Sequence, residues 1–361
     1  MQQLCCMVSE DVFALVVLSQ IRHLGPIRTR KLIERFGSPN DVIHTTIGQW
    51  GMGKLSPAEN DLESFKKMAS THLEWCNRMG IRVISYQHED YPRRLTYFED
   101  SPLYFLSRGS LIDSNRTIAI VGTRSHTSYG IQMVSELLDG IQHSGCTVIS
   151  GLALGIDTCA HQGALDRGMK TWACLAHGHE HIYPPQNRAL LREIERNGCA
   201  LSEHLPFVKA ERDFFPLRNR LIAALSDVIL VVESANKGGA LVTAQFGNDY
   251  NKEVVAVPGK VGDLKSEGCN ALIRQNKATI YTGVGDLLNL MNWNSNASHQ
   301  LELPVLDEQE LELYQHLLKV KSIHVDDLKM SVCQDNFFTT LLQLEMKGIV
   351  VWKPGNRIAL V

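Results

Sequence analysis

A glycine, a threonine and an arginine follow a predicted strand at a point of the sequence that suits a phosphate group. The stretch TIAIVGTRSHTSYG (117–130) opens as an apolar strand and closes as the start of a helix, with Gly122, Thr123 and Arg124 between them. Free backbone N–H groups and the helix dipole converge at such a turn and favour an anion. Arginine adds bidentate hydrogen bonds to phosphate oxygens. This turn is therefore predicted to hold a phosphate, either of a nucleotide or of a nucleic-acid backbone.

Two further segments carry residues of the same kind. Gly151 follows another predicted strand in SGLALGIDTCAH, and Arg218 and Arg220 lie beside Phe215 in FFPLRNRLIAALSD. The carboxyl ends of parallel strands meet at one edge of a sheet, so these residues are expected to converge there. An aromatic ring at that edge can stack on an unpaired base, a contact worth about 1–3 kcal/mol. The alternative interpretation places the phenylalanines in the core and pairs the arginines with neighbouring acids, Asp213 or Asp227.

The sequence lacks the common nucleotide-binding signatures. It has no G-x-x-x-x-G-K-[ST] loop, and the turn at Gly122 lacks the second and third glycines of G-x-G-x-x-G. The alternative function is an N-glycosidic hydrolase acting on a nucleoside phosphate, a class that carries GG-x-G-T-x-x-E. Aligning GGALVTAQ on that motif puts Leu241, Val242 and Gln245 at the third glycine, the threonine and the glutamate, so the catalytic acid is missing. A binding protein rather than an enzyme is therefore expected.

Three other acids could serve as an acid or base in such an enzyme. They are Asp157, Glu203 and Glu233. Asp157, at the start of a predicted helix, is expected to cap the helix or brace the glycine loop. Glu233 is expected to pair with a nearby arginine.

The composition is that of a folded, reduced protein. The 361 residues are 44% apolar and carry a formal net charge of −3, so no global basic field marks a nucleic-acid partner. The nine cysteines include no C-x-x-C pair, which is typical of reduced thiols in the cytoplasm. The apolar stretch at 11–21 is too short to cross a bilayer and lacks a signal-peptide pattern. A cytoplasmic protein without a membrane partner is expected.

The pattern of apolar runs predicts an α/β fold. Short runs rich in Val, Ile and Ala alternate with amphipathic stretches, at 117–122, 146–151, 171–176, 227–234, 253–259 and 278–283. Buried parallel strands joined by helices have this pattern, which predicts a Rossmann-like, doubly wound sheet in a domain over 86–292.

The flanking regions differ from this central domain. Residues 1–85 have helical periodicity, and a Gly-Pro turn at 25–26 between two helices predicts a SAM-like or helix-hairpin-helix domain. That hairpin could present basic side chains to phosphates or could simply be a packing domain. A polar linker is predicted at 293–304. Three helices and a two-stranded hairpin over 305–361 predict a winged-helix domain.

The predicted winged-helix domain is acidic. From residue 298 to the C-terminus the chain has six Lys or Arg against nine Asp or Glu. Duplex recognition needs a basic face. A role in protein interaction or dimer support is therefore favoured for it.

Several ordered blocks together resemble a known family. DYPRRL, IAIVGTRSHTSYG, VISGLALGIDTCAH, IYPPQN, FFPLRNRLIAALSD and VVAVPG follow one another over about 85–285. This order is similar to that of the DNA-processing protein A family, also called DprA or Smf. The resemblance implies a protein without cofactor that binds single-stranded DNA and loads the RecA recombinase onto it. It also implies DNA recombination and natural transformation as the setting, and a homodimer formed through the Rossmann-like domain.

The resemblance also implies roles for individual residues. Arg124 would contact backbone phosphate, Gly122 and Gly151 would supply close N–H donors, and Thr123 would belong to the same turn. Arg218 and Arg220 would line the same pocket. Lys209 would lie near the rim, and Phe215 would be a platform for a base.

Where the family usually has a Gly-x-Asp turn, this chain has AHGHEHIYP, with three alternating histidines. His177, His179 and His181 could share one face of an extended segment, either lining the mouth of the pocket or binding a metal ion. The first interpretation is favoured. Partly protonated histidines there would attract phosphate weakly below neutral pH.

Overall fold

The chain divides into two compact units, Met1–Trp293 and Asn294–Val361. The computed structural model describes residues 8–51, 53, 59–112, 114–293, 306–318, 323–332, 336–347, 349–353 and 356–360. The predicted linker at 293–304 lies outside the described residues except for Trp293, which is buried in the first unit. The first unit therefore extends one residue past the predicted end of the Rossmann-like domain.

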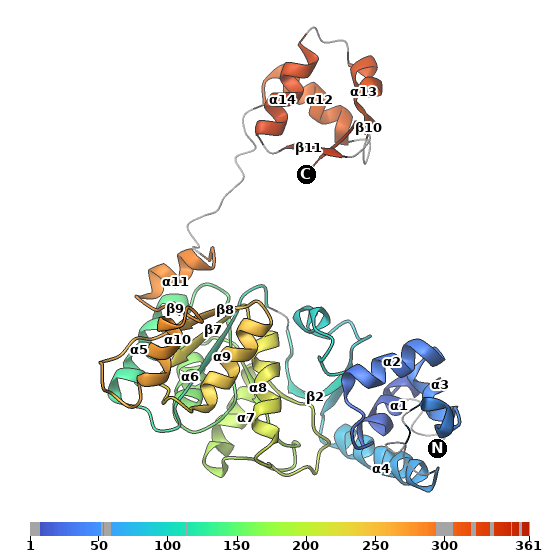
Figure 1. The fold of residues 1–361 in the computed structure, drawn as a ribbon, viewed down its shortest axis with the longest axis vertical. Coiled ribbons are helices and arrows are strands. Elements are labelled where there is room, and N and C mark those ends of the chain that lie inside the picture. The colour runs from blue at the N-terminus through green and yellow to red at the C-terminus, as the bar shows by residue number, and fades with distance from the viewer. Residues whose placement is uncertain are drawn as a thin grey trace. The chain divides into compact units, whose positions relative to one another are not determined.

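A nine-stranded sheet forms the centre of the first unit (Figure 1). Its strands are β1 (Arg82–Ser85), β2 (Tyr104–Gly109), β3 (Thr117–Gly122), β4 (Thr147–Ser150), β5 (Thr171–Leu175), β6 (Cys199–Ser202), β7 (Val228–Val232), β8 (Glu253–Ala256) and β9 (Thr279–Ile280). They lie in the order β1-β2-β6-β5-β4-β3-β7-β8-β9. In this order, each pair of neighbouring strands from β6 through β5, β4, β3, β7 and β8 to β9 is parallel. β1 and β2 add an antiparallel edge next to β6. The predicted doubly wound sheet is confirmed.

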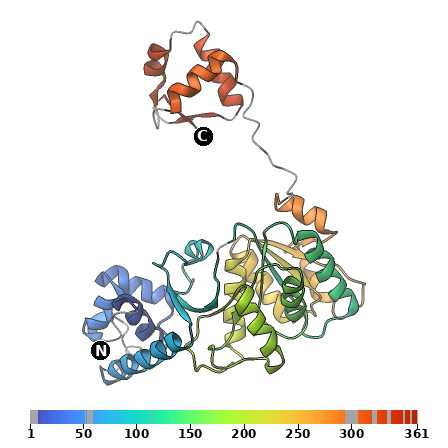
Figure 2. The ribbon, with the colours of Figure 1, turned by 180° about the vertical axis from the view of Figure 1, so that it is seen from behind.

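Helices cover both faces of this sheet (Figure 2). They are α5 (Ser128–Ile141), α6 (Ile156–Asp166), α7 (Arg188–Asn197), α8 (Phe214–Leu225), α9 (Gly239–Asp249), α10 (Glu267–Arg274) and α11 (Val284–Leu290). Successive strand residues point to opposite faces. Accordingly, Ala119 and Val121 of β3 pack with α8 and α9, whereas Ile118 and Ile120 pack with α5 and α6. Both faces of the parallel strands are therefore buried.

The N-terminal helices gather at the antiparallel edge of the sheet (Figure 1). They are α1 (Glu10–Ser19), α2 (Pro26–Phe36), α3 (Pro39–His44) and α4 (Glu59–Arg78), with short 3-10 turns η2 (Ile47–Trp50), η4 (Arg93–Tyr97) and, further on, η5 (Pro185–Asn187). Their core includes Leu103, Tyr104 and Leu106 from the β2 region. Arg30 of the predicted hairpin donates to the carbonyls of Glu99 and Ser101, at 3.2 Å each, so it serves packing. The boundary at residue 85 stays a prediction, because contacts do not divide the first unit there.

The second unit has a small core of its own. Helices α12 (Glu308–Leu318), α13 (Val325–Ser331) and α14 (Phe337–Met346) pack with strands β10 (Ile323–His324), β11 (Val350–Lys353) and β12 (Arg357–Leu360). The strands form an antiparallel sheet in the order β10-β12-β11. These are the three helices and the hairpin expected from the sequence, with β10 as an addition. Within the described residues, no helix of either unit is long and apolar enough to cross a membrane.

Candidate nucleic-acid interface

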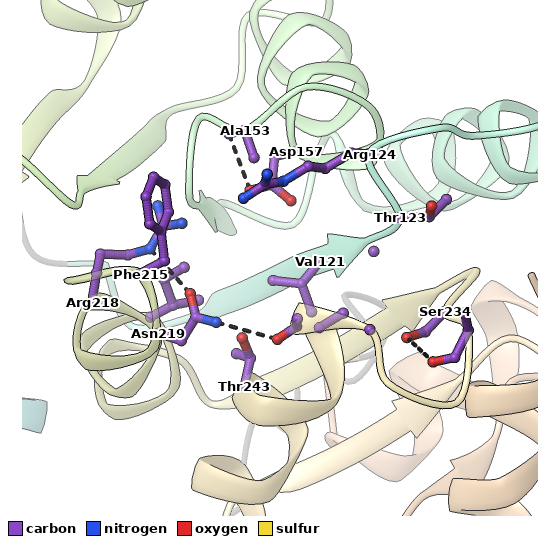
Figure 3. A pocket seen from close by; sticks show the side chains of 16 residues that line it. Val121, Thr123, Arg124, Ala153, Asp157, Phe215, Arg218, Asn219, Ser234 and Thr243 are labelled. Carbon is purple, nitrogen blue, oxygen red and sulfur yellow. Dashed lines mark hydrogen bonds between the residues drawn. The ribbon is translucent and has the colours of Figure 1, made fainter. Parts of the chain in front are cut away.

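A pocket of about 300 Å³ opens where the strand order reverses. From β3 the chain winds one way through β4 and β5, and from the adjacent β7 it winds the other way through β8 and β9. The turns after β3 and β7 diverge at such a point and leave a crevice at the carboxyl ends of the strands. The β3–α5 turn, the β4–α6 loop, the start of α8 and the β7–α9 turn line it. We call it the switch-point pocket (Figure 3).

Arg124 is the exposed cation of this pocket. Its guanidinium carbon lies 5.5 Å from the centre of the Phe215 ring, a cation–π distance. Among the described residues it has no ion-pair partner. Figure 3 shows the side chain reaching from the β3–α5 turn across the pocket. Its donors therefore remain available to an anion.

Arg218 lines the same pocket but is buried, at 5% exposure. It donates to the backbone carbonyls of Gly151 and of Cys174, the latter at 2.6 Å. A Cβ on Gly151 would come within 2.2 Å of the Arg218 guanidinium, so a larger residue here would displace Arg218. Arg218 thus joins the ends of β4 and β5. Its guanidinium also adds positive charge to the wall of the pocket. The structure brings Arg124 and Arg218 together, as expected.

The N–H group of Gly151 is already engaged. It donates to the Asp157 carboxylate at 3.1 Å, and the N–H of Ala153 donates to the same oxygen at 3.3 Å. Burial raises the pKa of Asp157, while the Arg218 charge and these N–H groups oppose that rise. Asp157 therefore braces the glycine loop, as predicted. The prediction that Gly151 supplies a free N–H donor is therefore wrong, because Asp157 takes that N–H group.

Gly122 and Thr123 hold three elements close together. A Cβ on Gly122 would lie 1.9 Å from the Val232 carbonyl oxygen, so glycine lets β3 and β7 approach here. The Thr123 N–H donates to the Glu233 carbonyl at 2.7 Å, and its own carbonyl accepts from Ile156 at 3.1 Å. Both residues line the pocket, and the Thr123 backbone is committed to the fold.

Glu233 fastens the β3–α5 turn to the end of β7. Its backbone has a φ of 53°, in the left-handed region. Its carboxylate accepts the Thr127 N–H at 2.9 Å and the Thr127 hydroxyl. The prediction that Glu233 pairs with an arginine is therefore wrong. The turn that carries Arg124 is held by the protein itself.

The start of α9 adds free donors to the pocket. Gly238 is its N-cap residue and has no side chain to cap the helix. The N–H groups of Gly239 and Ala240 find no acceptor in the part of the chain that the structure describes. Gly238, Gly239 and Ala240 all line the switch-point pocket. A helix N-terminus therefore reinforces the attraction of Arg124 for an anion.

Tyr183 is a residue that the sequence did not single out. Its ring is 46% exposed and meets Phe215 edge to face, with 5.7 Å between centroids. The half-buried Phe215 thus contacts both Tyr183 and Arg124. Phe214, by contrast, packs against His204 at 4.3 Å. Tyr183 belongs to the IYPPQN block, but only the fold brings it next to Phe215.

Arg220 does not line the pocket, so that prediction is wrong. Its guanidinium donates to Glu203 at 2.5 Å and to the Asp100 carbonyl at 2.6 Å. On a helix, residues two apart point in directions about 200° apart, so Arg218 and Arg220 face different surroundings. The acid partner of Arg220 is thus Glu203, and not Asp213 or Asp227. Asp227 is paired with Arg94 instead. Burial raises the pKa of Glu203, against the opposing Arg220 charge.

Lys209 is exposed in the loop before α8 and is not part of the pocket wall. The backbone of the same loop is fixed by the N–H of Gly178, which donates to the Val208 carbonyl at 2.8 Å. A role for Lys209 at the rim stays a prediction.

None of the alternating histidines, the partly exposed His181 included, lines the pocket, so that interpretation is wrong. His177 and His179 are 1% and 7% exposed. The His179 Nε2 lies 3.2 Å from the Leu106 carbonyl, and burial lowers the pKa of His179 to about 4. Burial also lowers the pKa of His177, so neither adds charge at neutral pH. Among the described residues, no three His, Cys, Asp or Glu side chains gather closely enough to hold a metal ion.

The comparison with known families rests on the same region of the chain. The sequence model of DNA recombination-mediator protein A matches residues 82–292, which include every wall of the pocket. The chain belongs to the DprA/Smf family. The DNA processing protein DprA of Bacillus subtilis is 35% identical over 231 residues, covering 63% of this chain and 78% of that protein. A DNA processing protein DprA of Mycobacterium tuberculosis, described there as putative, is 32% identical over 357 residues, or 93% of this chain and 88% of the relative.

Two solved DprA structures share the fold. DNA processing protein A of Streptococcus pneumoniae has a TM-score of 0.65 at 27% identity, covering 78% of this chain and 98% of that one. The protein from Helicobacter pylori, whose structure concerns its mode of single-stranded DNA binding, has a TM-score of 0.54 at 28% identity. The alignment covers 59% of this chain and 95% of the H. pylori chain. DprA proteins of two bacteria thus align with this chain over half its length or more.

Proposed function

We propose that this protein binds single-stranded DNA in the switch-point pocket, protects the strand, and loads the RecA recombinase onto it. It would act as a cytoplasmic homodimer, joined through its Rossmann-like domain, in DNA recombination and natural transformation. Support comes from membership of a DNA-processing family and from the H. pylori relative, whose structure describes single-stranded DNA binding.

The observation that carries the proposal is Arg124 placed over Phe215. An exposed guanidinium and an aromatic ring 5.5 Å apart offer a contact to phosphate and a stacking surface in one place. A strand with unpaired bases presents both partners at that spacing, whereas a duplex hides the base faces. The chain is otherwise nearly balanced in charge, at −3 over 361 residues, so affinity must come from this local site.

The remaining site residues fit supporting roles in this proposal. Arg218 supplies a buried positive charge behind the phosphate, and the free N–H groups at the start of α9 add donors. Gly122, Thr123 and Gly151 shape the turns. Lys209 contacts the strand outside the pocket, and Tyr183 continues the aromatic surface that Phe215 begins.

We propose a binding protein rather than an N-glycosidic hydrolase. Each acid available for catalysis already has a structural partner: Asp157 holds the glycine loop, Glu203 holds Arg220, and Glu233 holds Thr127. Gln245, which stands where the hydrolase motif has its glutamate, donates to Asp249 at 2.8 Å on the exposed side of α9.

The deciding experiment is a titration of the full chain with fluorescent oligo-dT, the matched duplex, and a panel of nucleotides. We expect tight binding of oligo-dT, much weaker binding of duplex, and no competition by nucleotides. Turnover of a nucleoside monophosphate, with no binding of oligo-dT, would replace this proposal by the hydrolase alternative.

Loading of the recombinase needs a separate assay. RecA filament growth on single strands coated with single-strand binding protein should be faster when this protein is present. If oligo-dT binds but filament growth is unchanged, the binding function stands and the loading function falls. Sedimentation of the free protein tests the homodimer.

A further inference from the structure

The exposed face of α14 carries three large apolar side chains in a row. Phe338, Leu342 and Met346 are 54%, 55% and 82% exposed. Spaced four residues apart, they stand on successive turns of one helix face. The opposite face of the helix fills the core of the second unit with Phe337, Thr340, Leu341 and Leu344. We call Phe338, Leu342 and Met346 the α14 stripe.

The charges around the stripe do not fit a nucleic acid. The chain from residue 298 to its end carries nine acidic against six basic residues. On α14 itself the charged side chain is Glu345. A face that binds phosphates needs clustered Lys or Arg, and affinity falls when they are missing. The stripe is therefore suited to another protein surface.

The two ends of the stripe carry opposite charges. At the N-terminal end, the Lys329 ammonium lies 4.9 Å from the centre of the Phe338 ring. At the C-terminal end, Glu345 accepts a hydrogen bond of 3.1 Å from the Trp352 indole N–H. Lys347, which follows Met346, is paired with the buried Glu310 at 2.6 Å. A surface with an apolar middle, Lys329 at one end and Glu345 at the other is complementary to itself when turned around.

We propose that the α14 stripe docks, antiparallel, against the α14 stripe of a second copy of this chain. A two-fold axis would pass beside Leu342, which would then meet Leu342 of the other copy. Phe338 would face Met346 of that copy, and Lys329 would lie near its Glu345. A parallel arrangement would instead bring the two lysines together, which is unfavourable.

The size of the stripe sets the strength of this contact. Three side chains bury far less than the roughly 800 Å² per partner of a stable interface, so the contact is weak when it stands alone. It would be populated when two copies are already held close, because a linked second contact gains from an effective concentration in the millimolar range. The inference does not depend on DNA binding, but it rests on the homodimer of the proposed function, which sedimentation tests separately.

The test is zero-length carbodiimide coupling of the unmodified full chain, mixed from ¹⁴N-labelled and ¹⁵N-labelled protein. We expect an amide bond between Lys329 of one copy and Glu345 of the other, identified by mass spectrometry as a mixed-label peptide pair. Within one copy these groups lie at opposite ends of the stripe, about two helical turns or 11 Å apart, so mixed labels identify the contact between copies.

Two variants with the same added charge sharpen the test. Leu342→Glu lies on the stripe and should lower the yield of the mixed-label adduct at least tenfold. Gln343→Glu lies next to it on the exposed side of α14 but off the stripe, and should leave the yield within about twofold. The double variant Lys329→Glu/Glu345→Lys restores the pair in reverse and should keep the adduct.

Three outcomes would overturn the proposal. The first is adducts of Lys329 or Glu345 only with the first unit or within one copy. The second is equal yields from Leu342→Glu and Gln343→Glu. The third is coupling of Lys329 or Glu345 only to RecA when RecA is added, which would assign the stripe to a different protein partner.

Discussion

Arg124 and Phe215 come from different elements, the β3–α5 turn and α8, yet the guanidinium carbon of one lies 5.5 Å from the ring centre of the other. Ninety residues of chain separate them, and they meet because β3 and β7 are neighbours at the reversal of strand order. This pair gives the pocket an exposed charge and a stacking surface. The first predictions follow from it.

Replacing Arg124 by alanine should weaken binding of oligo-dT several-fold and leave folding intact. The side chain is exposed and has no ion-pair partner among the described residues, so the melting temperature should change by no more than about 2 °C. Loss of one phosphate contact should reduce the slope of log K against log salt by about 0.7. Fluorescence anisotropy at several salt concentrations measures both.

The matched control is Arg196→Ala. Arg196 is an exposed arginine in the last turn of α7, which leads to the amino end of β6 and thus to the opposite edge of the sheet. Equal losses of affinity in the two variants would mean that general charge, not the pocket, binds the strand.

Arg218→Ala should lower the stability of the fold, unlike Arg124→Ala. It leaves the carbonyls of Gly151 and Cys174 without their donor in a buried place, at a cost of about 1–3 kcal/mol each. For a domain of this size that corresponds to a fall of roughly 5–15 °C in melting temperature. Differential scanning calorimetry checks it, and an unchanged melting temperature would refute the role of Arg218 as a brace.

Tyr183→Ala should weaken binding of oligo-dT by about 1 kcal/mol or more if its ring stacks on a base. Tyr97→Ala is the control, since Tyr97 is a 69% exposed tyrosine that does not contact Phe215. The double variant with Phe215→Ala should lose less than the sum of the single variants, because the two rings are in contact. Exact additivity would mean that the rings act at separate places on the strand.

The stability of the first unit should fall on acidification, in part through His179. Burial lowers the pKa of His179 to about 4, below the value of about 6.5 in the unfolded chain. Between these values the unfolded state binds more protons, so stability is complete above pH 6.5 and is lost progressively down to pH 4. At pH 5 the loss from this group approaches roughly 2 kcal/mol.

His179→Gln tests this contribution, because glutamine can still donate to the Leu106 carbonyl, the His179 partner at 3.2 Å. Between pH 7 and pH 5, the melting temperature of the variant should fall by a few degrees less than that of the original chain. Identical pH profiles would show that His179 does not couple to folding.

The parallel strands could be predicted because buried strands leave a strong signal. β3, for example, is a run of Ile, Ala and Val that ends in Gly122, as predicted. The strands that were missed are β1, β2 and β6. β6 is four residues long, CALS, without β-branched residues, and β1 begins four positions after the last residue of the long helix α4. Their pairing in the sheet, and not their local sequence, determines them.

The site could be predicted in part. Gly122, Thr123, Arg124, Phe215 and Arg218 line one pocket because they follow strand ends that a parallel sheet must bring together. Arg220 was misplaced although the geometry of a helix already separates it from Arg218. The histidines were misplaced because β5 ends at Leu175, so the following residues turn instead of alternating.

The hydrogen bonds between Glu233 and Thr127 affect how fast a ligand can bind. With the Glu233 carboxylate on the Thr127 N–H at 2.9 Å, the loop bearing Arg124 has its shape before anything binds. The conformational entropy of that loop is lost during folding, so an arriving strand needs to order only itself. Such a receptor is expected to capture its ligand at a rate limited by encounter and not by rearrangement of the protein.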